Sequence, residues 1–205
     1  FSNIERIILD LNQSKAEYIH FDVMDGDFVP NLTFGPKFIS NVRKFSNKVF
    51  DVHLMINRVD KFLDDYIRAG SDIITFHIEI NEDVENIIKK IKAKGIKCGL
   101  AIKPKTSWSE IQPYLQHIDQ VIIMTVEPGF GGQEFMNDQV DKIKNISNYI
   151  KLNNLRVGIE IDGGINFETG QTCVEAGANI LVAGSFLFNQ GDLITATNSL
   201  SDKFN

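Results

Sequence analysis

The stretch HFDVMDG, residues 20–26, combines the alternation of a β-strand with side chains that carry chemistry. Successive side chains of a strand point to opposite faces, so His20, Asp22 and Met24 share one face and the two apolar residues between them share the other. The apolar face is suited to packing. The polar face is poorly suited to a dry core, because a buried carboxylate needs a partner. The stretch therefore predicts a strand whose polar face is either solvated or functional.

Similar short apolar or β-branched runs recur along the chain at intervals of roughly 20 to 35 residues. The predicted strands are 18–25, 50–56, 73–79, 98–104, 120–126, 158–164 and 179–185. Amphipathic helical patterns lie between them, and the clearest cover 59–70, 82–95 and 137–153. No linker or low-complexity segment interrupts the pattern, which predicts a single α/β domain over residues 1–205.

The first recognisable element is a helix over 1–14, because Ile4, Ile7, Ile8 and Leu11 repeat at helical spacing. A helix follows a strand in a βα unit, so the pattern predicts one more strand ahead of residue 1. Eight βα units close a TIM (β/α)8 barrel, which is the predicted fold. A seven-stranded open sheet is the alternative.

Composition excludes several classes of protein. The apolar fraction of 43% excludes a disordered chain, and the formal charge of −6 argues against a nucleic-acid partner. No apolar run approaches the roughly 18 residues that span a bilayer, so no membrane partner is expected. Cys98 and Cys173 are far apart, which favours a reducing compartment such as the cytoplasm. An organellar location stays open, because the chain does not begin with methionine.

Four polar residues at the predicted strand ends form a candidate metal site. His53 lies in a second run, DVHLM, that alternates like the first, and Asp162 lies near the end of 158–164. With His20 and Asp22 they supply two imidazoles and two carboxylates, which suit one divalent ion such as zinc, iron, manganese or cobalt. Each histidine taken alone would more often be a hydrogen-bonded core residue.

Two further histidines are not included in this site. His77 repeats the strand pattern weakly, and we expect a structural role for it. His117 follows PYLQ in a helical stretch, where a surface position is expected.

The late strands end in glycine-rich turns: VEPGFGGQ (126–133), DGGIN (162–166) and VAGS (182–185). Glycine lets the backbone approach a ligand and turn its N–H groups inward, and such groups bind anions. TIM barrels often bind phosphate at the loops after the last two strands. Tight turns are the alternative interpretation, but three on consecutive strands favour a phosphate site. No GxGxxG motif or P-loop is present.

Seven motifs together resemble the ribulose-phosphate 3-epimerase family in order and spacing. They are HFDVMDGDFVPNLTFGP (20–36), DVHLMI (51–56), TFHIE (75–79), GLAIKP (99–104), MTVEPGFGGQEF (124–135), EIDGGIN (160–166) and AGANILVAGS (176–185). The resemblance covers almost the whole chain and implies a TIM barrel. It also implies a first strand that bears a serine close to the substrate and that would lie ahead of residue 1.

The resemblance implies a role for each matching residue. Asp22 and Asp162 would be the acid/base pair and, with His20 and His53, the metal ligands. The residues implied to contact the substrate or its phosphate are His53, Gly129, Phe130, Gly131, Gly132, Gly163, Gly164, Gly184 and Ser185. The residues implied to line the pocket are Met24, Met55 and Met124, although core packing is the commoner use of methionine.

The implied reaction interconverts ribulose 5-phosphate and xylulose 5-phosphate, which is a step of the pentose phosphate pathway. The resemblance also implies that the chain assembles into a homo-oligomer. Inverting a carbon next to a carbonyl needs an acid/base group on each face and stabilisation of the enediolate, which a metal ion can supply. The alternatives are epimerisation of allulose 6-phosphate and a barrel that binds a sugar phosphate without catalysis. A metal-independent decarboxylase is disfavoured, because the DxKxxD pattern is absent from HFDVMDG.

Overall fold

The computed structural model describes residues 3–204, and its sheet contains seven parallel strands. Each strand is hydrogen-bonded to the next in chain order. The strands are β1 (Tyr18–Met24), β2 (Val49–Met55), β3 (Ile73–His77), β4 (Lys97–Ile102), β5 (Gln120–Met124), β6 (Gly158–Asp162) and β7 (Ile180–Val182). Parallel strands need crossover connections, and helices supply them here.

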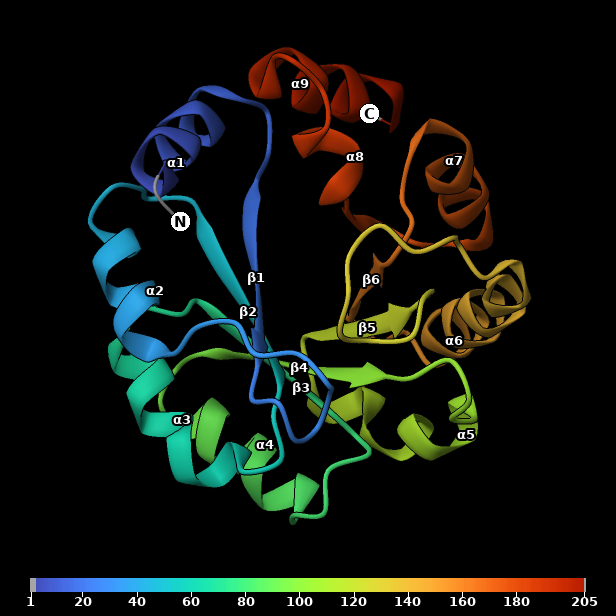
Figure 1. Cartoon of the computed structure of the whole chain (residues 1–205). Helices are drawn as coiled ribbons and strands as arrows, with labels where there is room; N and C mark the ends of the chain where they lie inside the picture. The colour runs from blue at the N-terminus through green and yellow to red at the C-terminus, as the bar shows by residue number, and fades with distance from the viewer. Residues whose placement is uncertain (1–2, 205) are drawn as a thin grey trace.

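Helices form a ring around the strands, and the sheet curls into a nearly closed TIM barrel (Figure 1). The α-helices are α1 (Ile4–Gln13), α2 (Pro36–Arg43), α3 (Val59–Arg68), α4 (Val84–Ala93), α5 (Trp108–Ile111), α6 (Val140–Leu152), α7 (Phe167–Ala176), α8 (Ser185–Phe188) and α9 (Leu193–Phe204). Two 3-10 turns, η1 (Gln112–His117) and η2 (Asn137–Gln139), precede β5 and α6. The predicted barrel fold is confirmed.

The predicted helices correspond to α1, α3, α4 and the combination of η2 with α6. Of the helix predicted over 1–14, Phe1 and Ser2 lie outside the described residues. Among residues 3–204, β1 and β7 are the two ends of the sheet. The strand expected ahead of residue 1 stays a prediction.

The barrel has an apolar outer layer and an interior that contains both polar and apolar side chains. Phe21, Phe50 and Phe76, which point outward, are at most 5% exposed and belong to the main hydrophobic cluster between sheet and helices. The alternate residues point inward. In the register of β1 with β2, His20 stands opposite Asp51, Asp22 opposite His53, and Met24 opposite Met55. The side chains that the alternation assigned to one face therefore gather inside the barrel.

All seven predicted strands extend beyond the observed ones, by one to three residues at the carboxyl end, and two of them show why. The strand predicted over 73–79 ends at His77, because Glu79 lies in a turn where its carboxylate accepts the backbone N–H of Lys103 at 2.7 Å. The strand predicted over 179–185 ends at Val182, and Ser185 begins α8. Helical hydrogen bonding starts there, since the carbonyl of Gly184 accepts backbone N–H groups two and three residues beyond Ser185.

The helix that follows β6 has well-defined ends. Asn166 and Thr169 form a capping box at the start of α7, which fixes the turn immediately after the predicted DGGIN motif. The helix ends at Gly177, whose φ of 112° is a left-handed conformation. A β-carbon at Gly177 would also lie 2.1 Å from the hydroxyl of Ser147, so only glycine fits there.

Two findings bear on the predictions from composition. In the part of the chain that is described, no helix is sufficiently long and apolar to cross a membrane. Cys98 and Cys173 are free and buried, and burial raises the pKa of each thiol to about 12.

Candidate metal centre and the pocket above it

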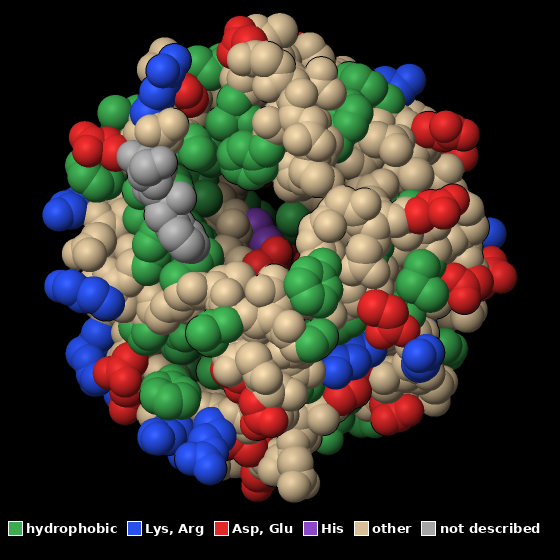
Figure 2. Space-filling model, in the orientation of Figure 1, with side chains coloured by type: hydrophobic (Ala, Val, Ile, Leu, Met, Phe, Trp, Pro, Cys, Tyr) green, Lys and Arg blue, Asp and Glu red, His purple; other side chains and the backbone are tan. Residues whose placement is uncertain are grey.

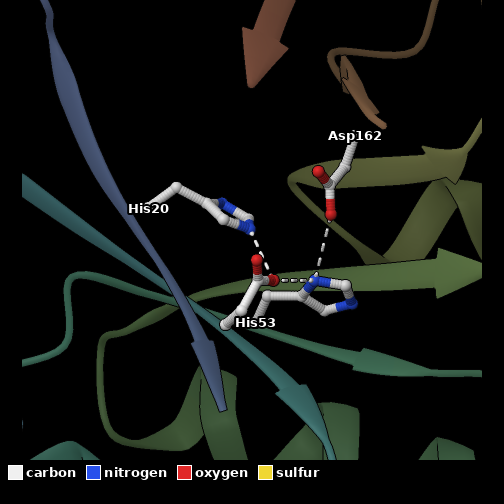
Figure 3. A group of neighbouring side chains, drawn as sticks. His20, His53 and Asp162 are labelled. Carbon is white, nitrogen blue, oxygen red and sulfur yellow. Dashed lines mark hydrogen bonds and ion pairs between the residues drawn. The ribbon is translucent and has the colours of Figure 1, made fainter. Parts of the chain in front are cut away.

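The four predicted metal ligands meet in the barrel. His20 and Asp22 come from β1, His53 from β2 and Asp162 from β6, and one donor atom of each lies within 4.8 Å of the others. Asp22 Oδ1 is 3.3 Å from His20 Nε2 and 3.1 Å from His53 Nδ1, while Asp162 Oδ2 is 3.7 Å from His53 Nδ1 (Figure 3). Residues 140 positions apart in the sequence thus share one polar centre.

The donor set fits a divalent first-row ion. Two imidazole nitrogens and two carboxylate oxygens are typical ligands of zinc, manganese, iron and cobalt. His20 Nε2 is buried without a hydrogen-bond partner among the described residues, and it faces Asp22. An unpartnered buried nitrogen aimed at a carboxylate is costly unless a further group binds there. An ion at this point would satisfy it.

The two histidines and Asp22 strongly perturb one another. Burial would raise the pKa of Asp22, but hydrogen bonds and charge from His20 and His53 outweigh it and hold that pKa well below its usual range. Burial would lower the pKa of His53, but Asp162 and Asp22 raise it to about 9. The pKa of His20 is likewise raised, because Asp51 and Asp22 outweigh the effect of burial. The negative charge of the carboxylates at this centre therefore favours binding of positive charge, either as protons on the histidines or as a metal ion.

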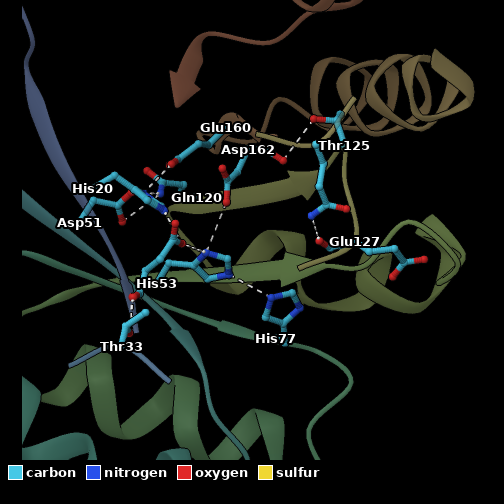
Figure 4. Close-up of polar contacts among 12 residues, drawn as sticks. His20, Thr33, Asp51, His53, His77, Gln120, Thr125, Glu127, Glu160 and Asp162 are labelled. Carbon is cyan, nitrogen blue, oxygen red and sulfur yellow. Dashed lines mark hydrogen bonds and ion pairs between the residues drawn. The ribbon is translucent and has the colours of Figure 1, made fainter. Parts of the chain in front are cut away.

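Below this centre, His20 is held by a second group of buried side chains (Figure 4). Its Nδ1 lies 2.8 Å from Asp51 Oδ2, to which it is hydrogen-bonded, and 3.0 Å from Glu160 Oε1. Gln120 Nε2 donates to both oxygens of Asp51 at 3.3 and 3.4 Å. Burial and the charge of Asp51 raise the pKa of Glu160 to about 8. This arrangement places the Nδ1 proton of His20 towards Asp51 and leaves Nε2 free for the centre.

Glu160 and Gln120 were missed by sequence reasoning. Both are inward-facing polar residues on otherwise apolar strands, and that was the signal that identified the histidines. Glu160 stands two positions before Asp162, as Asp51 does before His53. The recurrence of a carboxylate two residues before a ligand was therefore visible in the sequence.

A pocket opens above the metal centre. Figure 2 shows that this face is hollowed at its middle, with histidine and acidic side chains at the floor. The cavity has a volume of about 110 Å³. Of the predicted site residues, it is lined by Asp22, Met24, Met55, Met124, Gly129, Phe130, Gly131, Gly132, Asp162, Gly163, Gly164, Gly184 and Ser185. His20 and His53 do not line it. The two carboxylates thus face the pocket, and the imidazoles lie behind them.

The loops around the pocket are tied to one another. Asn31, in the loop after β1, donates its amide to the carbonyl of Gly129 at 2.7 Å. Thr125 donates its hydroxyl to the carbonyl of Gly163 at 2.6 Å, and Gln133 donates to the carbonyl of Phe130 at 2.7 Å. These polar side chains were not predicted. They anchor the glycine-rich turns from both sides of the pocket.

The glycines of the pocket are of two kinds. Gly164 has φ of +66°, and a β-carbon there would lie 2.9 Å from the backbone of Phe135, so its turn requires glycine for packing. Gly131 and Gly184 have open space where a β-carbon would be. Packing therefore explains why Gly164 is a glycine. Gly131 and Gly184 instead leave room for a ligand to approach the backbone.

The remaining histidines behave differently from each other. His117 is exposed in η1, as predicted. His77 is fully buried at the end of β3 and contacts the ligand histidine directly, with 3.0 Å between His77 Nε2 and His53 Nε2. Burial is the main cause that lowers the pKa of His77, to about 4.

Comparison with known proteins agrees with the geometry. A model of the ribulose-phosphate 3 epimerase family matches residues 1–188. Ribulose-phosphate 3-epimerase of Bacillus subtilis (strain 168) is 40% identical over 193 residues, covering 94% of this chain and 89% of the relative. The enzyme of the same name from Rhodobacter capsulatus is 42% identical over 195 residues, covering 95% and 84%.

Among solved structures, 3-hexulose-6-phosphate synthase superposes with a TM-score of 0.71, covering 100% of this chain and 95% of that one. Its sequence identity is 15%, so this similarity supports the barrel fold alone.

Proposed function

Because the chain belongs to the ribulose-phosphate 3 epimerase family, and is therefore an isomerase, we propose that it interconverts D-ribulose 5-phosphate and D-xylulose 5-phosphate. One observation carries the proposal: Asp22 and Asp162 project from β1 and β6 into the same pocket. Epimerisation removes a proton from one face of a carbon and returns one to the other face. Two carboxylates on different walls of one cavity suit this task.

The acid/base assignment follows from the reaction, which needs a proton acceptor on one face of carbon 3 and a proton donor on the other. Asp22 is hydrogen-bonded to His53 and faces the pocket, where its carboxylate can reach the substrate. It removes the proton from carbon 3, next to the carbonyl, and yields an enediolate. Asp162, in its acid form, returns a proton to the opposite face. The two residues exchange these roles in the reverse direction.

The metal centre would be formed by His20, Asp22, His53 and Asp162, and would hold one divalent ion of zinc, iron, manganese or cobalt. When bound, such an ion supplies electrostatic stabilisation of the negative charge that develops during proton removal. The protein's own task is to hold the four donors and to exclude water beneath them. His53 is fully buried and His20 nearly so, which keeps this floor dry.

The substrate would be anchored by its phosphate at the rim. In this proposal the phosphate lies against backbone N–H groups of the turns at Gly129, Phe130, Gly131 and Gly132, with Gly163, Gly164, Gly184 and Ser185. Met24, Met55 and Met124 line the pocket beside the reacting carbons, whereas His53 does not line it and would act as a metal ligand. Binding energy at the phosphate then orients carbon 3 between the two carboxylates.

The test is NMR of ribulose 5-phosphate incubated with the protein in deuterated water, with and without a strong chelator. We expect deuterium at carbon 3 together with xylulose 5-phosphate, loss of both on chelation, and recovery on adding a divalent metal. Asp162→Asn is the matched control, because it removes the acid/base group while keeping the side-chain volume.

Other outcomes would replace the proposal. Turnover of allulose 6-phosphate but not of the pentose would identify a hexose-phosphate epimerase. Phosphate-dependent binding of the sugar without exchange would identify a non-catalytic barrel. Full activity in protein proven metal-free by elemental analysis would remove the metal centre from the mechanism.

A further inference from the structure

His53 is linked to a buried chain of polar groups that the proposed reaction does not use. His53 Nε2 lies 3.0 Å from His77 Nε2 (Figure 4). His77 Nδ1 lies 3.0 Å from Glu79 Oε2. The other oxygen of Glu79 accepts the backbone N–H of Lys103 at 2.7 Å. The chain thus runs from the metal centre through two imidazoles to a carboxylate anchored on the next loop.

The direction of each hydrogen bond follows from the donors and acceptors. An ionised carboxylate only accepts, so the bond to Glu79 places a proton on His77 Nδ1. His77 is fully buried, which disfavours a second proton on its ring, so its Nε2 is an acceptor. His53 Nε2 must then be the donor of the bond between the two rings. In neutral His53 the remaining lone pair is on Nδ1, the atom that faces Asp22 and Asp162.

Packing alone does not account for this arrangement. His53 and His77 are both 0% exposed, and an apolar side chain in place of His77 would leave the Nε2 proton of His53 without a partner. A buried donor that loses its partner is destabilising. The stacked rings, with centroids 5.0 Å apart, also restrict how far His53 can turn.

We propose that His77 and Glu79 are positioning residues that fix the ring orientation and tautomer of His53, so that its Nδ1 lone pair is presented to the metal ion. The inference rests on the proposed function, because it assigns these residues to the metal centre described there. The two ligand histidines are then supported differently: His20 hydrogen-bonds a buried carboxylate directly, whereas His53 reaches one through His77.

The test compares zinc binding by wild type, His77→Leu, Glu79→Gln and the conservative His77→Asn. Affinity is measured by competition with a chromophoric chelator. Partners that orient ligand histidines typically contribute 10–100-fold in metal affinity, so we expect a loss of roughly that size in His77→Leu and Glu79→Gln. His77→Asn keeps an acceptor and a donor at this position, and we expect it to recover most of the affinity. His117→Asn and Glu85→Gln, at exposed positions, are matched controls that should bind zinc as wild type does.

A second readout separates positioning from general damage to the fold. NMR of ¹⁵N-labelled histidine rings in the zinc-loaded protein should show His53 protonated at Nε2 in wild type and in His77→Asn. Circular dichroism identifies any variant that does not fold. Because Glu79 lies in a turn, Glu79→Gln keeps the test decisive if His77→Leu fails to fold.

Two outcomes would overturn the inference in distinguishable ways. Wild-type zinc affinity in folded Glu79→Gln and His77→Leu, with weakened binding in Asp162→Asn, would reject the positioning role and leave the metal centre intact. Failure of the wild-type protein to bind zinc, manganese, iron or cobalt would reject the metal centre itself, and the inference with it.

Discussion

The floor and the rim of the pocket are built on different principles. The floor consists of side chains on strands. Asp22, His53 and Asp162 lie on β1, β2 and β6, and the pairing of these strands with their neighbours fixes where each side chain lies. The rim consists largely of backbone, since its residues are mainly glycines in turns anchored by Asn31 and Thr125. In the proposed function, side chains would supply the acid/base and ligand groups, and backbone N–H groups would supply an anion cradle. Substitutions at the floor should therefore change chemistry, whereas those at the rim should change binding or local folding.

The largest effect is expected at the floor. Asp22→Asn and Asp162→Asn should each lower turnover by at least ~100-fold, because a general acid/base group contributes on that scale. Their circular dichroism should show that the fold is intact. Turnover is measured by coupled assay or NMR. Near-normal turnover in either variant would remove that residue from its assigned role.

Asp51 and Glu160 are the two buried carboxylates beside His20, and we expect them to differ in how much they stabilise the folded protein. Asp51→Asn should lower the free energy of unfolding by roughly 3 kcal/mol, because it removes one member of the buried pair with His20. Glu160→Gln should cost less than about 1 kcal/mol near pH 7, because its pKa of about 8 already favours the neutral form that glutamine resembles. Urea denaturation of both metal-free variants measures the difference. Equal losses would contradict the neutral form of Glu160.

At the rim, two glycines should separate folding from binding. Gly164→Ala should lower the free energy of unfolding by about 2 kcal/mol, because its positive φ and the backbone of Phe135 leave no room for a β-carbon. Gly184→Ala should be as stable as wild type, since nothing lies within 4 Å of the added carbon.

The same Gly184→Ala variant tests the phosphate cradle. A methyl group there should raise KM roughly tenfold with little change in kcat, the loss expected for one hydrogen bond to a charged group. An unchanged KM would place the phosphate elsewhere on the rim.

A last effect concerns Glu79 and depends on pH. Burial would raise the pKa of Glu79, but His77 and its other partners lower it from 4.5 to about 2. Ionised Glu79 therefore stabilises the folded state above pH 4.5, and this stabilisation is lost as the pH falls through 2. Glu79→Gln should be less stable than wild type by roughly 1–2 kcal/mol at pH 7, and the two should converge near pH 2. The exposed control Glu85→Gln should show a deficit below ~0.5 kcal/mol.

Much of the floor was predictable from sequence, and the reason is geometric. In a strand the alternation of side chains determines which residues share a face, so His20 with Asp22 and Asp51 with His53 could be grouped without knowing the fold. The glycine turns were predictable for a similar local reason. Assembly into a homo-oligomer and the strand ahead of residue 1 stay predictions.

The side chains that contact His20 and His53 were not predictable in the same way. That Glu160 lies beside His20, and that His77 contacts His53, depends on how strands distant in sequence face one another across the barrel. A structural role was expected for His77, because it repeats the strand pattern only weakly.

By itself, then, the sequence determined the alternation of strands and helices, the inward face of each strand and the chemical types of the donors, because these follow from local periodicity. The tertiary structure alone decided that Asp22 and Asp162 face one pocket, that the histidines lie behind them and that buried carboxylates support both rings. These relations arise when the sheet curls on itself, since curling brings β1 and β6 to walls of the same cavity.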